Sequence, residues 1–102
     1  MKQLRQSYTV ETLQDGTRAL VVGWEVPEDA PLAVREGLAR RAITNSGRPC
    51  PCGAVATLPS RAERRRANRA GVVLRRAVLH EDDCPAADDN LAQALVDGGW
   101  SA

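Results

Sequence analysis

The feature that most constrains this chain is a pair of short turns that contain its three cysteines and its one histidine. Cys50 and Cys52 lie in the run Cys-Pro-Cys-Gly, and His80 and Cys84 lie in the run His-Glu-Asp-Asp-Cys-Pro. Zinc is typically bound by four cysteine or histidine side chains, supplied as two close pairs at the corners of a tetrahedron. The twenty-seven residues between the pairs allow the chain to fold and return. The sequence therefore predicts one Zn²⁺ bound by Cys50, Cys52, His80 and Cys84.

Other interpretations of these turns stay open. Only Pro51 separates Cys50 from Cys52, whereas the common zinc knuckle has two residues there. The alternatives to zinc are an iron–sulfur cluster, or free thiols beside a surface histidine. A catalytic zinc, as in hydrolases and deaminases, needs an open coordination position and a general base such as Glu81 or Asp82. Because four protein ligands leave no open position, we expect a structural ion and assign no catalytic residue.

Composition adds a reason for a structural metal. The chain has 102 residues, the length of one domain, so we expect a single zinc-stabilised domain over residues 1–102. It contains two Trp, one Tyr and no Phe. Aromatic rings supply much of the area buried in a small core, and a bound metal can replace the missing stabilisation. We interpret Trp24 and Trp100 as packing residues.

Local patterns in the first half predict a hairpin and a helix. Asp15-Gly16 lies between two β-prone runs, residues 8–12 and 20–26, and predicts an N-terminal β-hairpin. The two-residue period of a strand places one set of side chains on the side that we expect to face the core: Leu20, Val22, Trp24 and Val26. A helix is expected after Pro31, ending near Thr44.

The second half predicts two more helices. Ser60 and Glu63 match a capping box and Gly71 a helix stop, which indicates a helix over residues 61–70. The run over 72–79 is typical of a strand that leads to His80, and residues 54–58 are expected to be extended. A last helix is expected over 86–96. The fold class is therefore α+β: an N-terminal β-hairpin plus helix, a zinc-stapled strand-helix-strand unit and a C-terminal helix.

The charges are segregated along the chain. Residues 35–80 have a net charge of +9 and residues 81–102 a net charge of −6, although the whole chain has only +1. On a helical wheel, most arginines of the expected helix 61–70 fall within an arc of about 140°, and Arg66 lies to one side. Such a face suits phosphate, so we expect nucleic-acid or partner binding through five residues: Arg61, Arg64, Arg65, Arg66 and Arg69.

Several partners fit a face of arginines. An acidic protein is one alternative to nucleic acid, and the chain's own acidic segment is another. A merely solvated helix is a third, because thirteen Arg to one Lys is typical of a GC-rich genome. No aromatic residue interleaves with the arginines, so stacking on bases is not expected. The oligomeric state is not indicated by the sequence.

The combined motifs resemble those of a protein family. Cys-Pro-Cys-Gly-Ala at 50–54, Ser-Arg-Ala-Glu-Arg-Arg-Arg at 60–66 and His-Glu-Asp-Asp-Cys-Pro at 80–85 are similar to small uncharacterised zinc-binding proteins of actinobacteria and their phages. The resemblance implies the same zinc ligands and a phage or actinobacterial setting, in which the partner could be a host protein. It implies no established activity. The sequence shows no signal peptide or membrane span, so we expect a cytoplasmic protein, in the host cell if phage-encoded.

Overall fold

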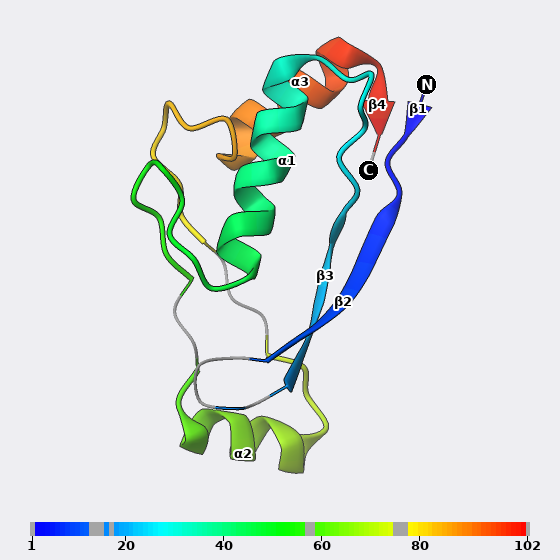
Figure 1. The fold of residues 1–102 in the computed structure, drawn as a ribbon. Coiled ribbons are helices and arrows are strands. Elements are labelled where there is room, and N and C mark those ends of the chain that lie inside the picture. Colours follow the sequence, from blue (N-terminus) through cyan, green and yellow to red (C-terminus); the bar gives the residue numbers. More distant parts are fainter. Residues whose placement is uncertain (1, 13–15, 17, 57–58, 75–77, 102) are drawn as a thin grey trace.

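The computed structural model describes residues 2–12, 16, 18–56, 59–74 and 78–101. Its helices and strands confirm the expected α+β class (Figure 1). In chain order the elements are β1 Lys2–Gln3, β2 Gln6–Thr12, β3 Arg18–Trp24, α1 Leu32–Asn45, α2 Arg61–Ala70, α3 Asp88–Gly98 and β4 Trp100–Ser101. No helix in the described part of the chain is both long enough and apolar enough to cross a bilayer.

The strands form two separate two-stranded sheets. β2 and β3 pair antiparallel as the predicted hairpin, with Gln6 opposite Trp24 and Thr12 opposite Arg18. The second sheet was not predicted: β1 and β4 pair in parallel and bring the two ends of the chain together. The Lys2 amide donates a 2.8 Å hydrogen bond to the Gly99 carbonyl in this pairing. Strands of two residues carry too little pattern to be found from the sequence.

The main core lies between α1, α3 and the base of the hairpin. Its buried side chains come from the N-terminus, α1 with its approach, and α3, and they are Leu4, Ala30, Val34, Leu38 and Leu91. Trp24 and Trp100 pack against this core, which confirms their interpretation as packing residues. α1 packs on α3 and on β3. The core is small, as the scarcity of aromatic residues predicts.

The helix boundaries follow their capping signals closely. α2 starts after Ser60, whose hydroxyl accepts a 3.1 Å hydrogen bond from the amide of Glu63, and it ends at Gly71, whose φ is +67°. α1 begins directly after Pro31. α3 begins and ends two residues later than expected and stops at Gly99, whose φ is +75°. A left-handed residue at this position is common at helix ends and favours glycine.

The predicted orientation of the hairpin is wrong for most of its length. Leu20 and Val22 were expected to face the core, but they are 65% and 47% exposed. Of that face, Trp24 packs against the core. α1 contacts β3, whereas α3 contacts neither strand of the hairpin among the described residues. The opposite face turns toward α1: a β-carbon added to Gly23 would lie 3.7 Å from Asn45 Nδ2. The apolar side of the ribbon therefore points away from the protein's own core.

The predicted strand over 72–79 is also absent from its described residues. Residues 72–74 and 78–79 belong to no strand, and residues 75–77 lie outside the described part of the chain. Val73 and Leu79 are 78% and 89% exposed. The run has high β-propensity, but this preference depends on a neighbouring strand, and both sheets form elsewhere. Residues 54–56 likewise belong to no strand, and 57–58 are outside the described residues.

α2 stands apart from the rest of the molecule. It contains no buried residue, and it packs on no other helix or strand of the described chain. Figure 1 shows α2 at the end of the molecule opposite α3 and the β1–β4 pair. The molecule is accordingly elongated, with extents of 42 × 26 × 20 Å. We call residues 53–79, which leave the first cysteine turn and return to His80, the α2 arm.

Candidate metal centre

The two turns come together beside α1 and place their four candidate ligands around one point. The ligand atoms of Cys50, Cys52, His80 and Cys84 all lie within 4.8 Å of one another. The Cys50 and Cys84 sulfurs are 3.7 Å apart, and His80 Nδ1 is 3.5 Å from the Cys52 sulfur and 3.6 Å from the Cys84 sulfur. This cluster could hold a metal ion.

Three of the six separations between the four ligand atoms match those of a tetrahedral site. Zinc binds sulfur at about 2.3 Å and nitrogen at about 2.05 Å, so tetrahedral angles place two sulfurs about 3.8 Å apart and sulfur and nitrogen about 3.6 Å apart. Each of the three recorded distances agrees with these values to about 0.1 Å. Cys50 and Cys84 are buried and the other two are half-buried. The Cys50 and Cys52 sulfurs also lie within 4.8 Å of each other, so the one-residue spacer lets both cysteines face the same point.

The first turn is shaped by its own backbone. The Cys50 amide donates to the Ala54 carbonyl at 2.8 Å, and the Gly53 amide donates to the Cys50 carbonyl at 2.8 Å. Gly53 has a φ of +98°, a conformation that favours glycine. The chain thus reverses beneath the sulfurs, as the Cys-Pro-Cys-Gly run predicts.

Backbone amides lower the pKa of one thiol, and burial raises the pKa of another. Hydrogen bonds from the backbone amides of Glu81 and Ala54 are among the causes that lower the pKa of Cys52 to about 6, with the Glu81 amide contributing most. Burial raises the pKa of Cys50. Amides that stabilise a thiolate favour the ionised form that binds a metal. Amides of both turns therefore favour the thiolate form of Cys52, which is the form that binds a metal.

The second turn is held by α3. The Cys84 amide donates to the Glu81 carbonyl at 2.9 Å, which closes the turn. The side-chain amide of Asn90, in the first turns of α3, donates to the carbonyls of Asp82 and Cys84 at 2.7 and 2.9 Å. Asn90 therefore attaches the backbone of the second turn to α3.

Cys84 has two further hydrogen-bond donors. Arg40 of α1 approaches its sulfur with Nη1 at 3.5 Å, and the Ala86 amide lies 3.4 Å from the same sulfur. Three thiolates and a neutral histidine around a divalent cation carry a net charge of −1, so a guanidinium at this place offsets the excess charge. No spacing pattern points to Arg40, because it lies ten residues before Cys50.

α1 also fixes the second turn by close packing. A β-carbon added to Gly37 would lie 2.6 Å from the Pro85 carbonyl oxygen and 2.9 Å from Leu91 Cδ1. Arg41 donates from Nε to the Ala86 carbonyl at 3.1 Å and forms a 2.7 Å ion pair with Asp88. The turn is therefore attached to α1 by a glycine contact and by two successive arginines. Gly37, like Arg40, was missed by the sequence analysis.

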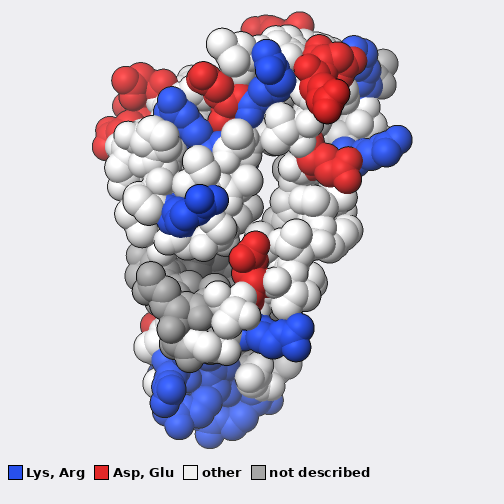
Figure 2. Space-filling model, viewed as in Figure 1, with Lys and Arg blue, Asp and Glu red and all other residues white. Residues whose placement is uncertain are grey.

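The arginines of α2 lie away from the candidate metal centre. Figure 2 shows basic side chains gathered at the α2 end of the molecule, whereas acidic side chains gather mainly toward the other end. The acidic segment 81–97 packs through α3 against α1 and not against α2, so it does not cover the arginines. Arg61, Arg65, Arg66 and Arg69 are exposed, and Arg64 is half-buried.

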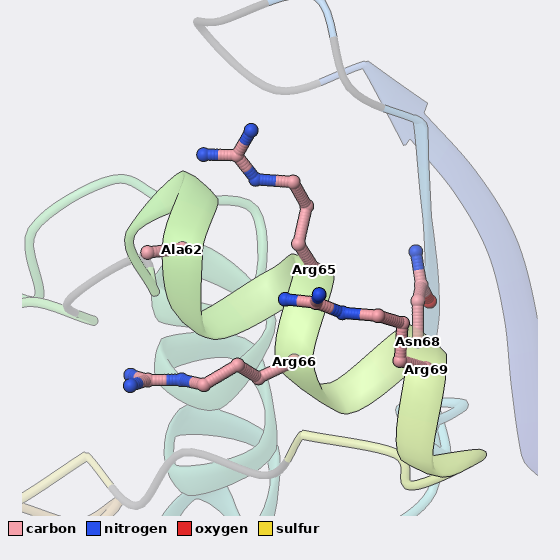
Figure 3. A pocket seen from close by; sticks show the side chains of 5 residues that line it. All are labelled: Ala62, Arg65, Arg66, Asn68 and Arg69. Carbon is pink, nitrogen blue, oxygen red and sulfur yellow. The ribbon is translucent and has the colours of Figure 1, made fainter.

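Part of this face forms a shallow hollow on the helix. Arg65, Arg66 and Arg69 line it together with Ala62 and Asn68, and its volume is about 540 Å³. Figure 3 shows the Arg65 and Arg66 side chains on either side of the small Ala62, with the Arg69 guanidinium extending toward the same region. Arg66, which the helical wheel placed to one side, thus joins Arg65 and Arg69. No ion pair or hydrogen bond of these three side chains is recorded within the described residues.

Comparisons with protein-family models, with curated proteins and with solved structures find no match for this chain. The resemblance to zinc-binding proteins of actinobacteria and their phages therefore stays an expectation from the motifs. Function is therefore inferred from the geometry of the cysteine and histidine cluster and of the α2 arginines.

Proposed function

We propose that a single structural Zn²⁺ joins the two turns and that the α2 arm it holds binds nucleic-acid phosphates. The donor set supports zinc, because three thiolates and one imidazole suit this ion. The ligand atoms lie within 4.8 Å of one another, which fits one ion, whereas an iron–sulfur cluster places several atoms between its ligands. Four protein ligands complete a tetrahedron, so no position is left for a catalytic water.

The position of the site explains what the ion would do. Cys52 and His80 directly flank the α2 arm, and α2 itself packs on no other helix or strand of the described chain. An ion between the two turns closes the base of the arm and fixes where its two ends leave the body. The ligands would also complete a second small core, in which Cys50 and Cys84 pack with Ala86. The metal is proposed to position α2 as well as to stabilise the fold.

The charge of α2 supports phosphate as its ligand. The helix carries five Arg and one Glu, a net charge of +4. Guanidinium groups form paired hydrogen bonds with phosphate and keep their charge at any physiological pH. Arg65, Arg66 and Arg69 surround a hollow that is open to solvent and wide enough for a phosphodiester. This grouping around a small alanine is the observation that carries the proposal.

The same surface indicates how nucleic acid would be bound. The residues of the hollow include no aromatic ring and only one amide side chain, Asn68. Contacts would therefore go mainly to the backbone, which gives affinity without strong sequence preference. We expect similar binding to unrelated sequences and a steep dependence on salt.

Fluorescence anisotropy with random duplex DNA, single-stranded DNA and RNA tests the proposal. The double variant Arg65→Ala with Arg69→Ala should bind more weakly and lower the slope of log affinity against log salt by about two. The matched control is Arg5→Ala with Arg18→Ala, which removes the same charge from exposed arginines outside α2. It should bind nearly as well as the unchanged protein.

Two results would overturn the nucleic-acid part of the proposal. One is no binding to any of the three probes at low salt, and the other is an equal loss in the control variant. In either case an acidic host protein becomes the partner to pursue, by affinity capture with the same two variants. The structural zinc would not be affected by that outcome.

A further inference from the structure

One face of the β2–β3 hairpin is apolar and uncovered. Tyr8 lies opposite Val22, and Val10 lies opposite Leu20, so these four side chains share a face of the ribbon. Their exposed fractions are 62%, 47%, 59% and 65% in that order. The opposite face carries Ser7 and lines a groove beside α1. The hairpin thus turns its more polar face inward and its apolar face outward, the reverse of a ribbon that packs on its own core.

The outward face of the hairpin lacks a partner among the described residues. Two-stranded sheets are marginally stable in water unless one face packs on something else. α1 meets β3, but the outward face has no covering element in the described chain. Four large apolar side chains in cross-strand pairs form a contiguous patch, which is typical of an interaction surface.

We propose that this face packs against the same face of a second copy of the chain. Two cross-strand pairs of Tyr, Val and Leu carry no charge, and the exposed Arg18 on the same face lies at the end of the ribbon opposite Thr12. Two copies can therefore meet over the apolar pairs about a two-fold axis while Arg18 stays at the edge in contact with water. Two such ribbons, stacked about 10 Å apart, form a two-layer sheet with its own small core. This arrangement gives each hairpin the buried face that its sequence pattern predicts.

The distribution of charge selects one orientation of the two copies. α2 has a net charge of +4, whereas the other described residues carry seven basic and eleven acidic side chains, a net charge of −4. Figure 1 shows β2 and β3 running from the β1–β4 end toward the α2 end. If the copies pack with their hairpins in opposite directions, the basic end of each lies beside the acidic body of the other. The same direction would bring two basic ends together, which is unfavourable.

Sedimentation velocity of the zinc-loaded full chain tests the dimer. We expect a concentration-dependent shift from monomer to dimer, which Val10→Lys abolishes. The matched control is Val96→Lys, which adds the same charge at another exposed valine, 68% exposed on α3. Circular dichroism and zinc content should be the same for all three proteins. A monomer at every concentration, or equal loss of dimer in both variants, would overturn the proposal.

Reversal of charge on α2 tests the orientation separately. Arg65→Glu with Arg69→Glu should weaken the dimer if the hairpins run in opposite directions, and strengthen it if the two basic ends are adjacent. A stronger dimer would therefore overturn the proposed orientation. Because the dimer is measured without nucleic acid, its failure would leave the phosphate-binding proposal standing, and the reverse also holds.

Discussion

Among single residues, the proposed zinc site requires four side chains: Cys50, Cys52, His80 and Cys84. Cys52→Ser or His80→Ala removes one ligand and leaves the remaining thiols around an incomplete tetrahedron. Because metal binding in small domains is coupled to folding, we expect the loss of several kcal/mol and a largely unfolded second half. Thermal melting followed by circular dichroism, with metal content measured in parallel, checks this. Asp82→Asn, an exposed change in the same turn, should melt like the unchanged protein.

Arg40 is the residue whose role is least evident from the sequence. Its Nη1 lies 3.5 Å from the Cys84 sulfur, so it would donate to the thiolate of the proposed zinc site. Removal of such an outer partner typically lowers metal affinity by about 10- to 100-fold. We expect this loss for Arg40→Ala in a competition titration with a chromophoric chelator, and a smaller loss for Arg40→Lys, which keeps the charge. An unchanged affinity in Arg40→Ala would show that the contact has no energetic role.

Among the helices and turns, the packing of α1 on the second turn predicts that a glycine-to-alanine change inside a helix lowers stability, the reverse of its usual effect. Alanine is favoured over glycine inside a helix by about 1 kcal/mol. At Gly37, however, a β-carbon would meet the Pro85 carbonyl oxygen at 2.6 Å, and this backbone atom cannot move without displacing the turn. We therefore expect Gly37→Ala to lower the free energy of unfolding by about 1–3 kcal/mol. Chemical denaturation measures it.

The opposite change at an exposed position of the same helix is the control for Gly37. Ala39 is exposed, so Ala39→Gly should cost only the difference in helix propensity, about 1 kcal/mol. If Gly37→Ala instead stabilises the protein as propensity alone predicts, then α1 does not contact the turn as closely as described.

What the sequence could predict differs between elements for physical reasons. Helix ends depend on local chemistry, so Ser60 and Gly71 were enough to place both ends of α2. The cluster of three cysteines and one histidine could be found because such residues in pairs at short spacing have few other uses in such a chain. Which face of the hairpin points toward the core could not be predicted. Alternation of apolar and polar residues shows that the two faces differ, but it does not show which of them meets the core. Gly37 and Arg40 act through contacts across the fold that leave no local pattern.

For the whole molecule, the inferred ion would connect the α2 arm to the body that contains α1 and α3. The body has a small core with two tryptophans at its edge, and the α2 arm packs on no other helix or strand of the described chain. Closing the arm at its base would keep a helix of net charge +4 at the far end from α3. Loss of the ion should therefore release the arm and weaken both the fold and phosphate binding. The apolar face of the β2–β3 hairpin is distant in the sequence from the two cysteine turns. The dimer proposed for that face can therefore be tested independently of the metal.

Removal of the metal tests whether one ion joins the two turns. The purified protein should contain one zinc per chain, and a strong chelator under reducing conditions should lower its melting temperature markedly. The same treatment should make all three thiols reactive toward a thiol reagent, and added Zn²⁺ should restore both the melting temperature and the protection. If the chelator-treated and untreated proteins melt at the same temperature, with the thiols equally reactive in both, no ion joins Cys50, Cys52, His80 and Cys84.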